Sequence, residues 1–159
     1  MIDLPFEGRV ALVTGSARRT GRALALAFAE AGADVAVHYR TSEGEANDVV
    51  AAIRALGRSS VPVQADLTKP DEAVRAVDMA AKDLGRLDIL VNNVGVIVWK
   101  EIDAITTEEW NASIDGTLNA TWHACRAALP HMRGQRFGRI VNILDDDADR
   151  INPVPLASP

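Results

Sequence analysis

Apolar stretches of two kinds alternate along the chain up to about residue 144. Short apolar runs predict five buried strands, at 9–15, 34–40, 60–67, 87–95 and 138–144. Longer stretches with apolar residues at helical spacing predict four helices, at 21–32, 42–57, 70–84 and 106–133. Strands that are apolar throughout and alternate with helices indicate a parallel sheet covered on both faces. With right-handed crossovers, the predicted fold class is α/β, a Rossmann-type doubly wound parallel sheet.

Local signals predict where these helices begin and end. Ser42 and Glu45 have the spacing of a capping box, and so do Thr106 and Glu109. A glycine follows each of the first three helical stretches and predicts the end of that helix.

Composition and charge limit the possible functions. The 159 residues form one predicted domain, 1–159, with the hydrophobic (48%) and charged (25%) content of a globular protein. A net charge of −5 argues against nucleic acid as a partner. The apolar runs are far shorter than a membrane span and the N-terminus lacks a basic, apolar leader, so we expect a cytoplasmic protein without membrane contact. Because Cys125 is the single cysteine, no disulfide and no cysteine-based metal cluster are predicted, and no other ligand pattern predicts a metal site.

The stretch TGSARRTG, residues 14–21, joins the first predicted strand to the first predicted helix. Glycines in such a turn let the backbone approach a pyrophosphate, and the N-terminus of the next helix attracts the anion. Gly15 and Gly21 occupy the first and last glycine positions. The alternative is an ordinary strand–helix turn that binds nothing, but the position of this stretch directly after the first strand favours dinucleotide binding.

Five segments together resemble the short-chain dehydrogenase/reductase family, in family order: TGSARRTGRALA, ADLT, LDILVNNVG, AALPHM and GRIVNI. The resemblance implies binding of NAD(H) or NADP(H) and hydride transfer to or from a carbonyl or alcohol carbon. Arg19 stands where the family has its middle glycine, which resembles the pteridine-reductase-like branch and its preference for NADPH. The implied substrate is a small carbonyl or pterin-like molecule. Family members commonly assemble through their long helix, which implies a homo-oligomer and leaves Trp110, Trp122 and Met132 as core or interface residues.

The residues after the second predicted strand favour NADP(H) over NAD(H). An NAD-binding site places an acidic residue there to hold the ribose hydroxyls, whereas this chain reads HYRTS and has none. Arg18, Arg19 and Arg40 are expected to converge on the 2′-phosphate, because a guanidinium grips phosphate with two hydrogen bonds. Solvated surface arginines are the alternative interpretation.

The resemblance implies further cofactor contacts. Asp66 matches the family aspartate that binds the adenine amino group, with capping of the strand end as its alternative role. The asparagines of NNVG are expected to tie the fourth strand to its neighbours, and Ile97 and Trp99 are candidate walls of the substrate pocket. The complete predicted cofactor-binding set is Gly15, Ser16, Arg18, Arg19, Thr20, Gly21, His38, Tyr39, Arg40, Thr41, Ser42, Asp66, Leu67, Asn93, Val94 and Gly95.

The family's catalytic residues match this chain only in part. They are a proton-donating tyrosine, a lysine four residues later that lowers its pKa, a serine after the fifth strand and an asparagine in the long helix. Asp145 stands in the serine position, as in the pteridine-reductase-like branch, and is the predicted substrate-orienting residue; a solvated acidic loop is the alternative. Thr117 stands in the asparagine position, with Asn119 two residues away. No tyrosine or lysine follows Asp145.

Three hypotheses follow from this partial match. The first is an NADPH-dependent reductase of which these residues are a piece, with the C-terminal strands and the Tyr–Lys pair missing. The second is a pseudoenzyme that binds NADP(H) without turnover, and the third is an interaction module that has lost the cofactor. The glycine turn and the arginines argue against the third. The resemblance implies that the fifth strand is interior in a complete family member, so in the 159-residue chain it is expected to form an exposed, apolar sheet edge.

Overall fold

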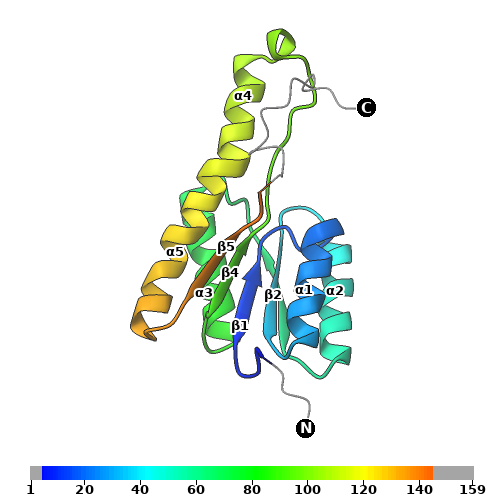
Figure 1. Cartoon of the computed structure of the whole chain (residues 1–159), viewed down its shortest axis with the longest axis vertical. Helices are drawn as coiled ribbons and strands as arrows, with labels where there is room; N and C mark the ends of the chain where they lie inside the picture. The colour runs from blue at the N-terminus through cyan, green and yellow to red at the C-terminus, as the bar shows by residue number, and fades with distance from the viewer. Residues whose placement is uncertain (1–4, 145–159) are drawn as a thin grey trace.

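A computed structural model describes residues 5–144 of the 159-residue chain. Within this range five parallel strands form one sheet in the order β3-β2-β1-β4-β5 (Figure 1). The strands are β1 (Val10–Val13), β2 (Asp34–Tyr39), β3 (Ser60–Gln64), β4 (Ile89–Asn92) and β5 (Arg139–Asn142). The predicted doubly wound α/β fold is confirmed, because successive crossovers place β2 and β3 on one side of β1 and β4 and β5 on the other.

The helices cover the sheet on both faces, as the apolar strands require (Figure 1). They are α1 (Arg19–Glu30), α2 (Glu43–Ala55), α3 (Pro70–Asp83), α4 (Thr107–Ile114) and α5 (Ala120–Gly134), with a short 3₁₀ turn, η1 (Ile102–Ala104). In β1, Ala11 and Val13 pack in the core under α1 and α2, while Leu12 packs in the core under α3 and α5. This alternation follows from the two-residue period of a strand.

The long predicted helix is interrupted by a π-helical segment. Between α4 and α5 lies η2 (Asp115–Asn119), so the stretch predicted as one helix consists of three parts. Gly116 within η2 packs against the side chain of Val96, where an added Cβ would lie 3.1 Å from the Val96 Cβ. The predicted capping box at its start is confirmed: Thr106 accepts a hydrogen bond from the Glu109 amide at 3.2 Å, and Glu109 accepts one from the Thr106 amide at 3.1 Å.

The other predicted capping box does not form. Ser42 is the N-cap of α2, but its side chain makes no capping hydrogen bond. The carboxylate of Glu45, which would have completed the box, instead forms an ion pair with the guanidinium of Arg18. The prediction was therefore wrong because a tertiary partner competes for Glu45.

The two remaining expectations about the fold concern the sheet edge and the membrane. Within the described residues β5 is the last strand of the sheet and Val141 is 42% exposed, and an exposed apolar edge of the whole chain stays a prediction. None of the helices in residues 5–144 has the length and apolar character needed to cross a membrane.

Candidate cofactor-binding site

The turn between β1 and α1 closes tightly on itself. Gly15 has a φ of +62°, a conformation that glycine adopts without steric cost. Gly21 packs directly against the carbonyl of Gly15, and an added Cβ would also lie 2.7 Å from the Asn93 side-chain nitrogen. Only a residue without a side chain fits there. The backbone thus has the close approach that a phosphate-binding turn requires.

Arg19 has a backbone conformation that favours glycine. Its φ is +48°, in the left-handed region that non-glycine residues rarely occupy. The turn therefore holds a strained arginine at a position that glycine would occupy without strain.

The N-terminus of α1 is open to an anion. Arg18, its N-cap residue, makes no side-chain capping hydrogen bond, and the first turn of α1 carries no acidic residue. The amide groups of this first turn and the positive end of the helix dipole therefore favour a negatively charged ligand. Arg18 and Arg19 add positive charge at the same point.

The end of β4 is fastened to the turn by a pair of polar side chains. The Thr14 hydroxyl oxygen accepts hydrogen bonds from the amides of Asn93, at 2.8 Å, and Val94, at 3.1 Å. The Asn93 side-chain nitrogen donates in return to the Thr14 carbonyl at 2.9 Å, and Asn92 donates to the Asn142 side chain of β5 at 2.9 Å. The predicted tying role of both asparagines is confirmed, whereas Thr14 was not singled out from the sequence.

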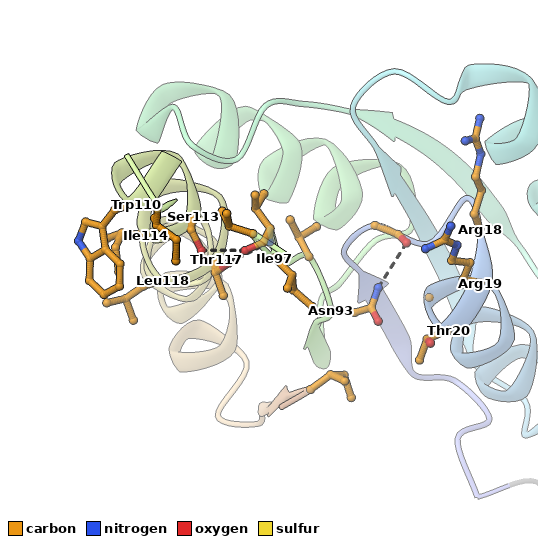
Figure 2. A pocket seen from close by; sticks show the side chains of 18 residues that line it. Arg18, Arg19, Thr20, Asn93, Ile97, Trp110, Ser113, Ile114, Thr117 and Leu118 are labelled. Carbon is orange, nitrogen blue, oxygen red and sulfur yellow. Dashed lines mark hydrogen bonds between the residues drawn. The ribbon is translucent and has the colours of Figure 1, made fainter. Parts of the chain in front are cut away.

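Two neighbouring cavities lie at the carboxyl ends of the strands. The larger, of about 910 Å³, separates the glycine turn from α4 and η2, with Arg18, Arg19 and Thr20 on one side and Trp110, Ile114 and Leu118 on the other (Figure 2). The smaller, of about 220 Å³, lies over the ends of β2 and β3. Both are lined by Gly15, Val94, Gly95 and Val96, so this shared backbone separates them.

Most of the predicted cofactor-binding residues surround these cavities. The larger is lined by Arg18, Arg19, Thr20, Gly21 and Asn93, and the smaller by His38, Arg40, Asp66 and Leu67. Four predicted residues line neither of these two cavities: Ser16, Tyr39, Thr41 and Ser42. Ser16 is buried and donates its hydroxyl hydrogen to the Val13 carbonyl, and Tyr39 lies in the core under α1 and α2.

The three arginines predicted to converge occupy different positions around the site. Arg18 and Arg19 line the larger cavity and Arg40 the smaller. Arg18 is paired with Glu45 of α2, which places an acidic group beside the basic turn. Convergence of all three on one phosphate stays a prediction.

Asp66 is held as a carboxylate at the rim of the smaller cavity. Its Oδ1 accepts hydrogen bonds from the Thr68 hydroxyl at 2.7 Å and the Thr68 amide at 3.1 Å. The Thr68 hydroxyl lowers the pKa of Asp66 most, and Arg40 and Lys69 contribute in the same direction. A charged acceptor is therefore available there for an amino group of a ligand.

The predicted catalytic residues differ in where they lie. Thr117, on η2, lines the larger cavity, and its hydroxyl oxygen accepts a hydrogen bond from the Val96 amide at 2.9 Å. Asn119 instead donates to Asp115 one turn earlier, at 2.7 Å. Asp145 lies outside the described residues.

The wall of the larger cavity opposite the arginines is apolar. Ile97 lines it as expected, together with Trp110, which was not predicted as a wall. Trp99 does not line it and is 63% exposed, so neither the wall role nor the core role predicted for Trp99 is found. An apolar wall facing a basic turn suits a ligand with one anionic part and one apolar part.

Residues 9–150 match the family model described as short chain dehydrogenase. The chain belongs to the short-chain dehydrogenase family. The glycine turn, the NNVG segment and the order of strands described above are therefore those of a family member.

Several known proteins are similar to this chain. Hydroxynaphthalene reductase arp2 of Aspergillus fumigatus is 38% identical over 87% of this chain and 50% of its own length. A 3-oxoacyl-[acyl-carrier-protein] reductase FabG of Staphylococcus epidermidis is 37% identical over 84% of this chain and 54% of its own. The structure of a short chain dehydrogenase from Burkholderia cenocepacia in complex with NADP superimposes with a TM-score of 0.87 at 38% identity, covering 95% of this chain and 61% of that one. The chain thus spans about half the length of the curated relatives it matches.

Proposed function

We propose that this chain is part of an NADP(H)-dependent oxidoreductase that reduces a carbonyl group of a small carbonyl-containing or pterin-like substrate. The observation that carries the proposal is the closed glycine turn at the open N-terminus of α1, with Arg18 and Arg19 beside it and no acidic residue directly after β2. When bound, NADPH supplies the hydride. The related Burkholderia protein was solved in complex with NADP, which supports the choice of cofactor.

The residues of the two cavities are proposed to bind different parts of such a cofactor. The first turn of α1 fits a pyrophosphate, because no side chain caps its amides and no acidic residue lies in it, and Gly15 and Gly21 give the turn before it a tight shape. In the smaller cavity Asp66 accepts a hydrogen bond from the adenine amino group, and Arg40 binds the 2′-phosphate. Gly95 lines both cavities and is proposed to let the cofactor lie close to the backbone there.

The substrate is proposed to bind in the larger cavity against its apolar wall. Trp110, Ile114 and Leu118 offer contact to a ring or an acyl chain, and Thr117 stands beside them. Two relatives are named as a hydroxynaphthalene reductase and a 3-oxoacyl-[acyl-carrier-protein] reductase, which supports a carbonyl substrate. Asp145 is proposed to orient the reacting oxygen.

Assembly into a homo-oligomer through α4 and α5 is also proposed. It is supported by Trp110 and Trp122, which are 58% and 60% exposed, whereas Met132 is buried in the core.

Cofactor selection tests this proposal directly. We expect the chain to bind NADPH more tightly than NADH, as measured by calorimetry. Arg40→Asp should weaken NADPH binding by roughly ten- to a hundredfold, the effect of losing a charged hydrogen bond, and change NADH binding little. Arg75→Asp, an exposed arginine on α3 that lines neither cavity, is the matched control. Equal affinities for the two cofactors in the parent chain would refute the proposed preference.

A second candidate function is NADP(H) binding without turnover, and it rests on the position of Tyr39. Tyr39 is the single tyrosine of the sequence and lies in the core under α1 and α2, where it cannot protonate a substrate in the larger cavity. We therefore expect the 159-residue chain to bind NADPH without oxidising it. Steady loss of NADPH absorbance in the presence of a ketone substrate would contradict this expectation.

A further inference from the structure

The imidazole of His38 connects the ends of three strands beneath the site. Its Nδ1 lies 3.0 Å from the amide nitrogen of Gly15, which follows β1. Its Nε2 lies 3.1 Å from the carbonyl oxygen of Ala65, which follows β3. The backbone of His38 adds a third link, because its carbonyl accepts a hydrogen bond from the Ser16 amide at 2.9 Å. Two residues of the glycine turn are therefore held by one residue of β2.

The partners of the ring fix its tautomer. The Gly15 amide can only donate a hydrogen bond, so Nδ1 must be an acceptor and carry no proton. The Ala65 carbonyl can only accept, so Nε2 must carry the proton. Only the neutral Nε2–H imidazole satisfies both contacts. His38 is 3% exposed, so water cannot easily replace either partner.

We propose that His38 is a positioning residue of the cofactor site, whose neutral Nε2–H ring fixes the glycine turn against β3 and does not itself bind phosphate. This rests on the proposed function, and it differs from the role first expected for His38, which was direct contact with the cofactor. Both ring nitrogens are already bonded to the protein, so neither is available to a ligand. The ring acts on the cofactor through Gly15, which lines both cavities.

The surroundings of the ring favour the neutral form. Burial lowers the pKa of His38 to about 4, against smaller raising effects of the Ala65 carbonyl and of Asp66. The other charged groups on the surrounding elements are Arg40 at the end of β2, Arg18 and Arg19 on the turn, and Glu72 of α3, which binds the Asp66 amide. A proton on Nδ1 would place two donors against each other at Gly15, and the link to the turn would be lost.

Imidazole NMR of the full chain tests the tautomer without any variant. We expect the nitrogen chemical shifts of His38 to report the Nε2–H tautomer at about pH 7 and at about pH 5.5, because the ring is buried. His123 and His131 serve as internal references in the same spectrum. An Nδ1–H tautomer, or titration of His38 near its ordinary pKa of 6.5, would overturn the proposal.

Two substitutions test the effect on the site. His38→Gln can still offer an oxygen to Gly15 and an amide N–H to Ala65, so we expect its affinity for NADPH to stay within about threefold of the parent. His38→Leu leaves the Gly15 amide without this acceptor, and we expect at least about a tenfold loss of NADPH affinity with the circular dichroism spectrum retained. A folded Leu variant that binds as tightly as the parent would overturn the proposal.

The remaining outcomes are also decisive. If His38→Leu does not fold, the tautomer of His38 and the NADPH affinity of His38→Gln decide. An Nδ1–H tautomer overturns the proposal, and so does a His38→Gln variant that loses about tenfold or more of the parent's NADPH affinity. If the parent chain binds no NADPH, the proposed function fails. The tautomer and the protection of the Gly15 amide from hydrogen exchange then still decide whether His38 holds the turn.

Discussion

At the scale of single residues, the strained Arg19 in the glycine turn bears most on function. A non-glycine residue in the left-handed region costs about 1–2 kcal/mol relative to ordinary conformations. Arg19 has this conformation at a φ of +48°, directly at the N-terminus of α1. A side chain retained at such a cost beside an anion-binding turn is explained if its charge serves the ligand.

Replacing Arg19 by glycine separates charge from strain. We predict that Arg19→Gly leaves the free energy of unfolding unchanged or raises it by up to about 1 kcal/mol, because relief of strain offsets the greater flexibility of the unfolded chain. NADPH affinity should fall severalfold, and NADH affinity much less. The matched control is Arg136→Gly, because Arg136 follows α5 at a φ of +54° and lines neither cavity. Denaturant titration and calorimetry measure both quantities; a control that weakens NADPH binding equally would contradict the interpretation.

Among the secondary-structure elements, two helices begin with the same sequence signal but with different structures. Thr106 and Glu109 form a reciprocal capping box at the start of α4. Ser42 and Glu45 have the same spacing, yet Glu45 pairs with Arg18 and Ser42 caps nothing.

Alanine substitutions should reveal this difference. We predict that Thr106→Ala lowers the free energy of unfolding by about 1 kcal/mol, the usual cost of losing an N-cap side chain. Ser42→Ala should lower it by only a few tenths of a kcal/mol, because no capping bond is lost. Urea unfolding of the two variants beside the parent measures both values. Equal losses would show that Ser42 caps α2 in solution.

The sequence predicted every strand and most helix ends of the described chain, because each depends on local periodicity and on glycine stops. It did not predict η2, since the packing of Gly116 against Val96 joins residues far apart in the sequence. It also did not show that both nitrogens of His38 are engaged, because Gly15 and Ala65 meet that ring only when three strands align. Spacing along the chain identified which residues lie at the site, and the register of the sheet decided what each one contacts.

For the whole molecule, the two ends of the sheet serve different purposes. The carboxyl ends of the strands hold the candidate site, and the amino ends hold a buried carboxylate, Asp88. Burial alone would raise the pKa of Asp88, but hydrogen bonds from Arg86, the Val10 amide and Arg9 outweigh this and lower it. The stability contributed by Asp88 is therefore present above its ordinary pKa of 3.8 and is lost only as the pH falls below that value.

His38 acts on global stability in a separate, higher pH window. Its folded-state pKa of about 4 lies below the ordinary 6.5, so between these values the unfolded chain binds more protons than the folded chain. Stability therefore falls as the pH decreases through this window, by roughly 2 kcal/mol between about pH 7 and pH 5. We predict this loss for the parent chain in urea unfolding, and a clearly smaller loss for His38→Gln, which cannot take up a proton. His131→Gln removes a partly exposed histidine that pairs with Asp78 and should leave most of the loss in place. A parent chain whose stability stays flat over this range would show that the folded chain takes up a proton on His38 as readily as the unfolded chain does, which contradicts the prediction.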